Sequence, residues 1–211
     1  MEITKLGHCC LIIEVDGVRI LTDPGMFSTG LDKATGIDVV LITHEHQDHL
    51  HTDSLKTILQ HNPKTKVFTN RGVEKLLEKE GIVYELLENG QQATVLGVLL
   101  ESFGEKHATV YQEYGQVMNT GYFIANRFFY PGDAFTDPHK PVEILAVPVA
   151  GPWMKIEEAI DYAKRIKPHT AFPVHDGILS YVKPFLTPLE KFLAPEGINF
   201  TVIETGETRK F

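Results

Sequence analysis

The stretch IDVVLITHEHQDH, residues 37–49, joins a run of apolar residues to a dense group of histidine and acidic side chains. Its first part, Ile37–Ile42, is a nearly continuous run of β-branched residues and leucine, which is typical of a strand buried on both faces. Four side chains that commonly bind metals follow within six residues: His44, His46, Asp48 and His49. The pattern predicts a metal site at the exit of a buried strand, where a rigid edge meets a backbone that is free to turn.

The spacing of these four side chains indicates two neighbouring metal positions. His44 and His46 are two residues apart and can point the same way, toward one ion. Asp48 and His49 begin the next turn and can face a second ion nearby. Neutral imidazoles with a carboxylate suit zinc, iron or manganese better than calcium or magnesium. The competing interpretation, a solvated histidine-rich loop ahead of a helix, is disfavoured by so particular a spacing.

Further motifs along the chain resemble those of the metallo-β-lactamase superfamily, whose signature His-x-His-x-Asp-His follows an apolar strand as HEHQDH does here. Four other motifs match in the family's order: Asp23 in LTDPG (residues 21–25), His107 in GEKH (104–107), Asp133 in YPGD (130–133) and His175 in FPVH (172–175). The resemblance is closest to the branch of small metal-dependent hydrolases that contains L-ascorbate-6-phosphate lactonase and N-acylphosphatidylethanolamine-hydrolysing phospholipase D. Gly7-His8 leading into an apolar strand, and the late FPVH motif, are similar to that branch.

The resemblance implies a role for each matched residue. The first metal ion is expected to bind His44, His46 and His107; the second is expected to bind Asp48, His49 and His175, with Asp133 bridging the two. Asp23 is expected to orient a ligand or to hold the metal loop, residues 43–49, by hydrogen bonds. Judged without the resemblance, His107 and His175 could equally be loop histidines, and Asp133 and Asp23 could be turn residues.

The implied activity is hydrolysis of an ester, lactone, amide or phosphodiester bond in a small-molecule substrate. Two divalent ions, with Zn²⁺ favoured and Mn²⁺ or Fe²⁺ as alternatives, would activate a shared water. Asp48 is expected to orient the resulting hydroxide, and His8 or a metal-bound water to serve as leaving-group acid. Trp153 and Lys106 are candidate substrate contacts, although core packing of Trp153 and simple solvation of Lys106 explain them as well.

The expected fold class, by resemblance, is α/β (α+β): a four-layer αββα sandwich of the metallo-β-lactamase type, forming a single domain over residues 1–211. The apolar pattern itself predicts a hairpin of Cys9–Val15 and Val18–Leu21 around Asp16-Gly17. Helices are expected over Thr52–His61, Gly72–Lys79, Ile156–Ile166 and Pro188–Leu193. Further strands are expected at Lys66–Thr69, Val83–Leu87, Ala93–Leu96, Val98–Phe103, Tyr122–Ala125, Arg127–Tyr130, Val142–Val149, Ala171–Val174 and Phe200–Ile203.

Composition restricts the partners and the location of the protein. Acidic residues outnumber basic ones 28 to 20, for a net charge of −8, which argues against a nucleic-acid partner. No apolar run approaches the ~20 residues of a membrane helix, and no secretory signal is apparent, so no membrane insertion and a cytoplasmic location are expected. The two cysteines, Cys9 and Cys10, are adjacent, and buried thiols are favoured there over a redox or ligand role. Relatives are often oligomers, which leaves a homo-oligomer open.

Three other classes of protein share parts of this pattern. An iron-dependent oxidoreductase of the persulfide dioxygenase type uses the same scaffold, but its mononuclear site would leave Asp48 and His49 without a second metal ion. A nuclease of the superfamily usually carries a clamp domain or an RNA-binding exosite, for which these motifs leave no room. A non-catalytic, metal-stabilised module is disfavoured by the intact ligand set, because structural zinc sites are closed and four-coordinate.

Overall fold

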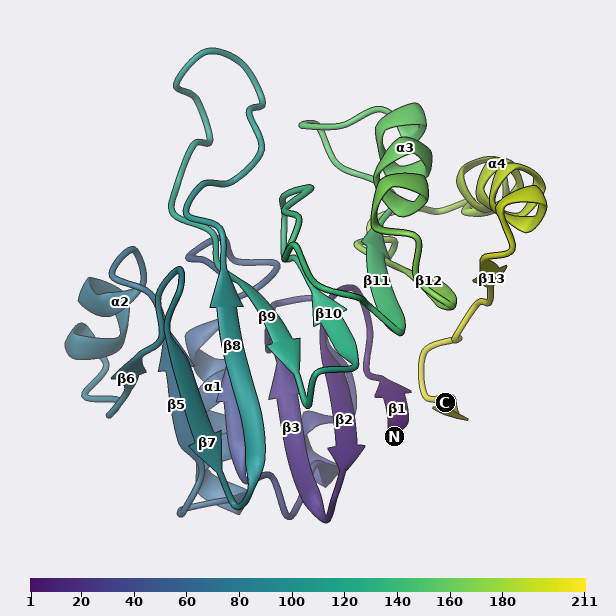
Figure 1. The fold of residues 1–211 in the computed structure, drawn as a ribbon. Coiled ribbons are helices and arrows are strands. Elements are labelled where there is room, and N and C mark those ends of the chain that lie inside the picture. The colour runs from purple at the N-terminus through teal and green to yellow at the C-terminus, as the bar shows by residue number, and fades with distance from the viewer.

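Two seven-stranded β-sheets lie face to face in the computed structural model, which describes residues 1–211 (Figure 1). The first sheet contains, in spatial order, β14 (Thr208–Lys210), β1 (Glu2–Lys5), β2 (Leu11–Val15), β3 (Val18–Thr22), β4 (Val39–Leu41), β5 (Lys66–Thr69) and β6 (Glu85–Leu86). The second contains β13 (Asn199–Phe200), β12 (Thr170–Val174), β11 (Ile144–Pro148), β10 (Phe128–Tyr130), β9 (Gly121–Ile124), β8 (Val98–Phe103) and β7 (Gln92–Val95).

Helices cover the outer face of each sheet, and three clusters of buried side chains separate the layers. The first sheet packs against α1 (Thr52–His61) and α2 (Glu74–Lys79), and the second packs against α3 (Ile156–Ile166) and α4 (Lys183–Leu193). A third cluster fills the space between the sheets. Along β4 the side chains alternate between two of these layers: Leu41 faces the other sheet and Val40 faces α1, which explains the uninterrupted apolar run. The expected four-layer αββα sandwich is confirmed.

Local sequence patterns place most elements within a few residues. The β2–β3 hairpin turns at Asp16 and Gly17, both at positive φ, as the Asp-Gly pair predicts. The bounds of α1 and α3 agree with the prediction, whereas α4 does not begin at Pro188 but five residues earlier, at Lys183. Pro184 lies in the first turn of α4, where a backbone N–H would have no acceptor within the helix.

Two further differences concern the ends of the chain. The pairing of β1 with β14 brings Glu2 opposite Lys210, a contact that no local pattern indicates. The strand expected at Phe200–Ile203 is limited to Asn199–Phe200, although Ile203 is still buried in the core between the sheets. No helix in the structure has the length and apolar character that a bilayer crossing requires.

Strand direction brings several loops to one edge of the sandwich. Strands β3 and β4 are parallel, and so are β10, β11 and β12. Because β8 and β10 are both antiparallel to β9, β8 runs in the same direction as β10. The carboxyl ends of these strands therefore share an edge of each sheet, where a long loop, residues 104–120, rises above β8 in Figure 1.

Candidate metal centre

The first ligand set predicted from the sequence is assembled in the structure. His44 and His46 leave the end of β4, and His107 comes from the loop after β8. The ring centroids of His46 lie 4.7 Å from those of both His44 and His107, and the His44 and His107 centroids are 5.0 Å apart. One nitrogen of each imidazole falls within 4.8 Å of the others. These three side chains can therefore bind one ion.

The second ligand set lies directly beside the first. Asp48, His49, Asp133 and His175 each offer one donor atom, all within 4.8 Å of one another. Asp133 stands between the two sets: its Oδ1 is 3.0 Å from His49 Nε2, and its Oδ2 is 2.8 Å from His175 Nε2 and 3.3 Å from His107 Nε2. A carboxylate in this position could bridge two ions, which is the role that the resemblance implies for Asp133.

Buried atoms without hydrogen-bond partners show that the site suits a metal. All such side-chain atoms in the protein except Arg19 Nε and Glu101 Oε2 belong to this region: Nε2 of His8, His44, His49, His107 and His175, Nδ1 of His175 and Oδ1 of Asp133. Burying polar atoms without a partner is unfavourable, and so many in one place are a feature of a ligand site. Imidazoles with two carboxylates are the donor set that Zn²⁺ and similar ions prefer.

The two sets differ in how they hold protons. Burial, reinforced by the neighbouring imidazole of His49, lowers the pKa of His44, and burial also lowers the pKa of His46. At His175, burial disfavours the imidazolium, but the Asp133 carboxylate outweighs it and raises the pKa to about 10. The same carboxylate raises the pKa of His49 well above its ordinary value. In the absence of metal, His44 and His46 are therefore neutral, whereas His49 and His175 are protonated.

Asp23 holds the metal loop from beneath, as the sequence predicts for a residue that orients ligands. Its Oδ2 is 2.7 Å from Nδ1 of His49 and accepts hydrogen bonds from the hydroxyls of Thr43 (2.7 Å) and Tyr130 (2.6 Å). The Thr43 hydroxyl is also 2.9 Å from Nδ1 of His44. Because Nδ1 of His49 donates its proton to Asp23, the lone pair of Nε2 is free for a metal. Tyr130, which comes from the opposite sheet, is a supporting residue that sequence reasoning missed.

A second group of contacts fixes Asp133. The backbone N–H of Asp133 donates to Oδ1 of Asn119 (3.0 Å), and the indole N–H of Trp153 donates to Oδ2 (3.1 Å). Asn119 in turn donates to the carbonyl of Pro131 (2.9 Å) and is fully buried. Asn119 also escaped the sequence analysis, since an asparagine in a loop carries no distinctive local signal.

A cavity of about 100 Å³ opens onto both ligand sets. Its wall consists of five of the predicted ligands together with three other side chains: His46, Asp48, His107, Asp133 and His175 with Val110, Pro152 and Trp153. The structure thus places Trp153 beside the cavity while burying it. Lys106 is exposed and borders a separate hollow with Glu105 and Met118, so the structure does not bring it to this cavity.

His8 lies behind Asp48 and does not line the cavity. Its Nδ1 accepts a hydrogen bond from the N–H of Gly177 (3.1 Å), which leaves the ring proton on Nε2. That nitrogen is 3.3 Å from Oδ2 of Asp48, and burial lowers the pKa of His8. The geometry suits a neutral imidazole that orients Asp48 rather than one that reaches a leaving group.

Comparison with known proteins identifies the family. Residues 2–175 match the β-lactamase superfamily domain. A Mycobacterium tuberculosis protein is 34% identical over 185 residues, which cover 85% of this chain and 86% of that protein. A metal-dependent hydrolase from Aeropyrum pernix is 26% identical over 100% of this chain and 97% of its own length. The chain therefore belongs to the metallo-β-lactamase superfamily, in its branch of small metal-dependent hydrolases.

Two further similarities bear on the branch and the fold. An N-acyl-phosphatidylethanolamine-hydrolysing phospholipase D from Caenorhabditis elegans is 22% identical over 89% of this chain and 67% of its own length. The solved structure of a metallo hydrolase from Ignicoccus hospitalis superimposes with a TM-score of 0.79, at 24% identity, over 100% of this chain and 98% of that one. Neither comparison favours the iron-dependent oxidoreductase over a hydrolase.

Proposed function

We propose that this protein holds two divalent metal ions in the described cluster and hydrolyses a small-molecule substrate at the adjacent cavity. The observation that carries the proposal is the pair of adjoining ligand sets that meet at Asp133. Zn²⁺ is the favoured ion, because every ligand is an imidazole or a carboxylate and no ring of backbone carbonyls is involved. The cytoplasmic location and the single domain over residues 1–211 stay predictions.

Asp48 is the residue we assign to the chemistry at the cavity. Bound in the cluster, two metal ions would lower the pKa of a water molecule and polarise the bond under attack. The Asp48 side chain is 25% exposed, whereas those of His44, His49, Asp133 and His175 are at most 3% exposed. Its carboxylate therefore faces the cavity, where it can accept and orient the proton of the attacking water, while His8 holds it from behind.

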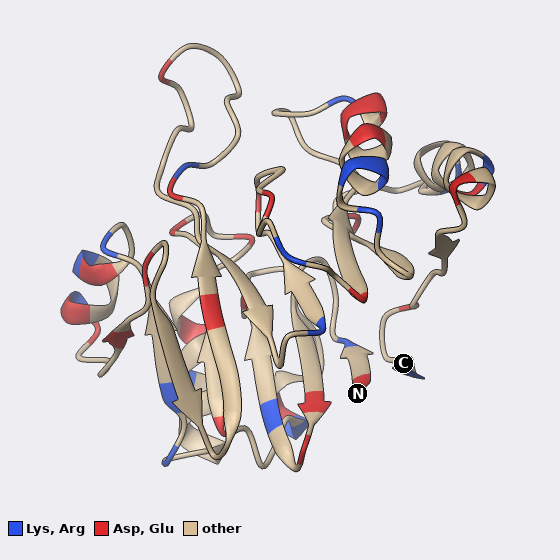
Figure 2. Cartoon of the chain, viewed as in Figure 1, with Lys and Arg blue, Asp and Glu red and all other residues tan.

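The cavity wall favours an uncharged scissile group. No lysine or arginine borders the cavity, and Val110, Pro152 and Trp153 give it an apolar side. An ester, lactone or amide fits such a wall better than a phosphodiester, whose negative charge usually draws an arginine or lysine. Over the whole chain, basic side chains are scattered among acidic ones without a continuous basic stripe (Figure 2), which supports a small-molecule substrate over a nucleic acid.

A substrate screen with a matched pair of variants tests this function. The metal-loaded wild type is assayed on ester, lactone, amide and phosphodiester substrates beside Asp48→Ala and Gln47→Ala. Gln47 is the exposed neighbour of Asp48 in the same loop. We expect turnover by the wild type and by Gln47→Ala, and a loss of on the order of a hundredfold or more in Asp48→Ala. Equal activity of Asp48→Ala and the wild type would remove Asp48 from the mechanism.

A further inference from the structure

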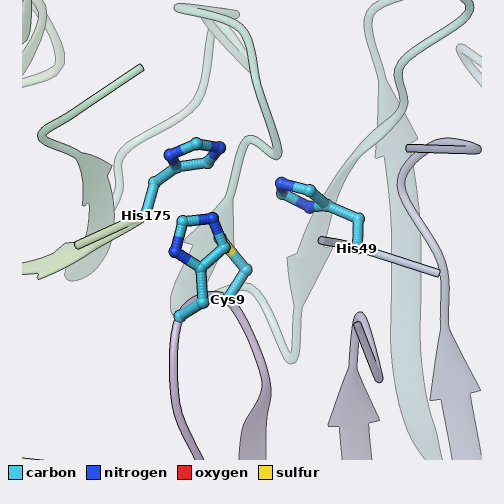
Figure 3. A group of neighbouring side chains, drawn as sticks. Cys9, His49 and His175 are labelled. Atoms are coloured by element: carbon cyan, nitrogen blue, oxygen red, sulfur yellow. The ribbon is translucent and has the colours of Figure 1, made fainter. Parts of the chain in front are cut away.

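The two adjacent cysteines lie in different surroundings. Cys10 belongs to the cluster between the first sheet and its helices, whereas Cys9 belongs to the core between the two sheets. Both are buried free thiols, as the sequence favours. Cys9, His49 and His175 belong to one group of neighbouring side chains (Figure 3). Sγ of Cys9 is within 4.8 Å of a ring nitrogen of each of these histidines and of His8.

Two of the imidazoles around Cys9 have ring nitrogens that no hydrogen bond occupies. Nε2 of His49 has no hydrogen-bond partner, and neither ring nitrogen of His175 has one, although His49 and His175 are 0% and 2% exposed. His8 differs, because its Nδ1 accepts from Gly177 and its Nε2 carries the proton. After losing a proton, His49 and His175 can therefore each bind a metal ion, whereas the Nε2 proton of His8 faces Asp48.

We propose that Cys9 is a ligand of the metal ion at the second position, binding it as a thiolate together with His49 and His175. Ligands of a tetrahedral zinc ion lie roughly 3.5 Å from one another, so donor atoms within 4.8 Å can meet on one ion after small side-chain rotations. The inference rests on the proposed function, since it requires an ion at this position. Cys9 belongs to the buried core and does not line the cavity, so its sulfur would approach the ion from the core.

A thiolate ligand would set the choice of metal. Thiolates favour zinc, cobalt and cadmium over manganese and magnesium, whereas Asp48 and Asp133 alone would discriminate less. Asp48 and Asp133 belong to the neighbouring donor group, which shares His49 and His175 with the group that contains Cys9. The second position would then bind thiophilic ions selectively, while the all-histidine first position would not depend on Cys9.

Cobalt absorption spectroscopy tests the proposal without any activity assay. The metal-free full-length protein is titrated with Co²⁺, and the near-ultraviolet thiolate-to-cobalt charge-transfer band and the visible d–d bands are recorded. We expect both kinds of band in the wild type. Cys9→Ser and Cys9→Ala should lose the charge-transfer band and keep d–d bands from the first position. Cys10→Ser is the matched control, and it should keep the charge-transfer band.

Each other outcome has a distinct meaning. Visible d–d bands without a charge-transfer band in the wild type would overturn the role of Cys9 and leave the proposed function standing. A charge-transfer band that persists in the Cys9 variants, or that disappears in Cys10→Ser, would overturn it as well. Failure of the wild type to bind cobalt at all would overturn the proposed function itself. Because the wild-type spectrum and the Cys10 control are decisive, the test does not depend on the Cys9 variants folding.

Discussion

At the scale of single residues, Asp23 links both halves of the metal loop. One of its oxygens contacts His49, Thr43 and Tyr130, and the other accepts the backbone N–H of Thr43 (2.8 Å). Asp23 adopts a positive φ of 38°, an unfavourable conformation that surrounding contacts must maintain. We expect a side chain so placed to orient His49 for a metal ion without binding the ion itself.

Asp23→Asn is expected to weaken metal binding by about 10- to 100-fold, although none of the seven predicted ligands is changed. An asparagine keeps only one accepting oxygen, and its NH2 group is a donor that would face the N–H and O–H donors around Asp23. Tyr130→Phe, which removes one of these hydrogen bonds, should have a smaller effect. Competition with a chelating dye measures the affinities, with the surface substitution Asp53→Asn as control. Affinity equal to that of the control would show that Asp23 does not orient the ligands.

Metal binding is expected to release protons, and the second ligand set should be their source. His49 and His175 have raised pKa values in the metal-free protein, so they are protonated at neutral pH and must lose protons to bind an ion. Apparent affinity should therefore rise with pH across the neutral range. His44 and His46, whose pKa values are lowered, should release none. Calorimetric titration in buffers of different ionisation enthalpy measures the release, and binding heats that do not depend on the buffer would contradict it.

The residues themselves indicate a metal site only at HEHQDH (residues 44–49), and His107, Asp133 and His175 were predicted because their short motifs after strands match those of the family. The residues that surround these ligands could not be predicted in the same way. Tyr130 is one aromatic residue in an apolar strand, and its contact with Asp23 spans 107 positions of the chain. Cys9 looks like any buried strand thiol, since only the assembled fold shows that His49 and His175 lie beside it.

At the scale of elements, the loop after β3 and the metal loop after β4 lie in backbone contact. Gly25 has no room for a side chain, because a Cβ there would fall 1.7 Å from the carbonyl oxygen of Asp48 and 2.7 Å from the nitrogen of His49. The backbone N–H of Met26 also donates to the carbonyl of Gln47 (2.8 Å). The turn that carries Asp23 therefore fixes where Asp48 and His49 can stand.

Gly25→Ala is expected to displace Asp48 and His49 and to impair binding at the second metal position, with a loss of stability of about 1–3 kcal/mol from the forced shift. Gly81→Ala is the matched control. Its positive φ of 67° makes alanine unfavourable, but a Cβ there meets nothing within 4 Å. Metal content and thermal unfolding measure both effects. Full occupancy of both positions in Gly25→Ala would contradict the close contact of the two loops.

Periodicity located the elements whose stability is local and missed those that depend on distant pairing. Helix α3 has an unambiguous apolar stripe, and Ala159, Tyr162 and Ala163 are its buried residues. The prediction began α4 at Pro188, five residues late. The buried residues Leu186, Leu189 and Leu193 form one apolar stripe that begins before Pro188. The pairing of β1 with β14 follows from chain ends that meet only in the folded protein.

At the scale of the whole molecule, the proposed metal centre joins the two sheets. His44, His46, Asp48 and His49 follow β4 of the first sheet, whereas His107, Asp133 and His175 follow strands of the second. Each ion would therefore bind ligands from both halves of the sandwich. Metal binding should stabilise the packing of one sheet on the other, in addition to any role in the reaction.

Removing the metal is expected to lower the melting temperature. An ion present at about 1,000 times its dissociation constant stabilises the folded state by about 4 kcal/mol. Thermal unfolding with and without a strong chelator measures the change, and adding Zn²⁺ back should restore the original value. An unchanged melting temperature in chelator, with metal shown to be absent, would mean that the ions do not join the sheets.

Anomalous diffraction at the zinc absorption edge, measured on crystals of the zinc-loaded protein, would locate the ions of the proposed metal centre directly. Two peaks are expected: one among His44, His46 and His107, and one among Asp48, His49 and His175, with Asp133 between them. Zinc bound elsewhere on the protein, or no peak within coordination distance of these side chains, would show that these residues do not form a metal centre.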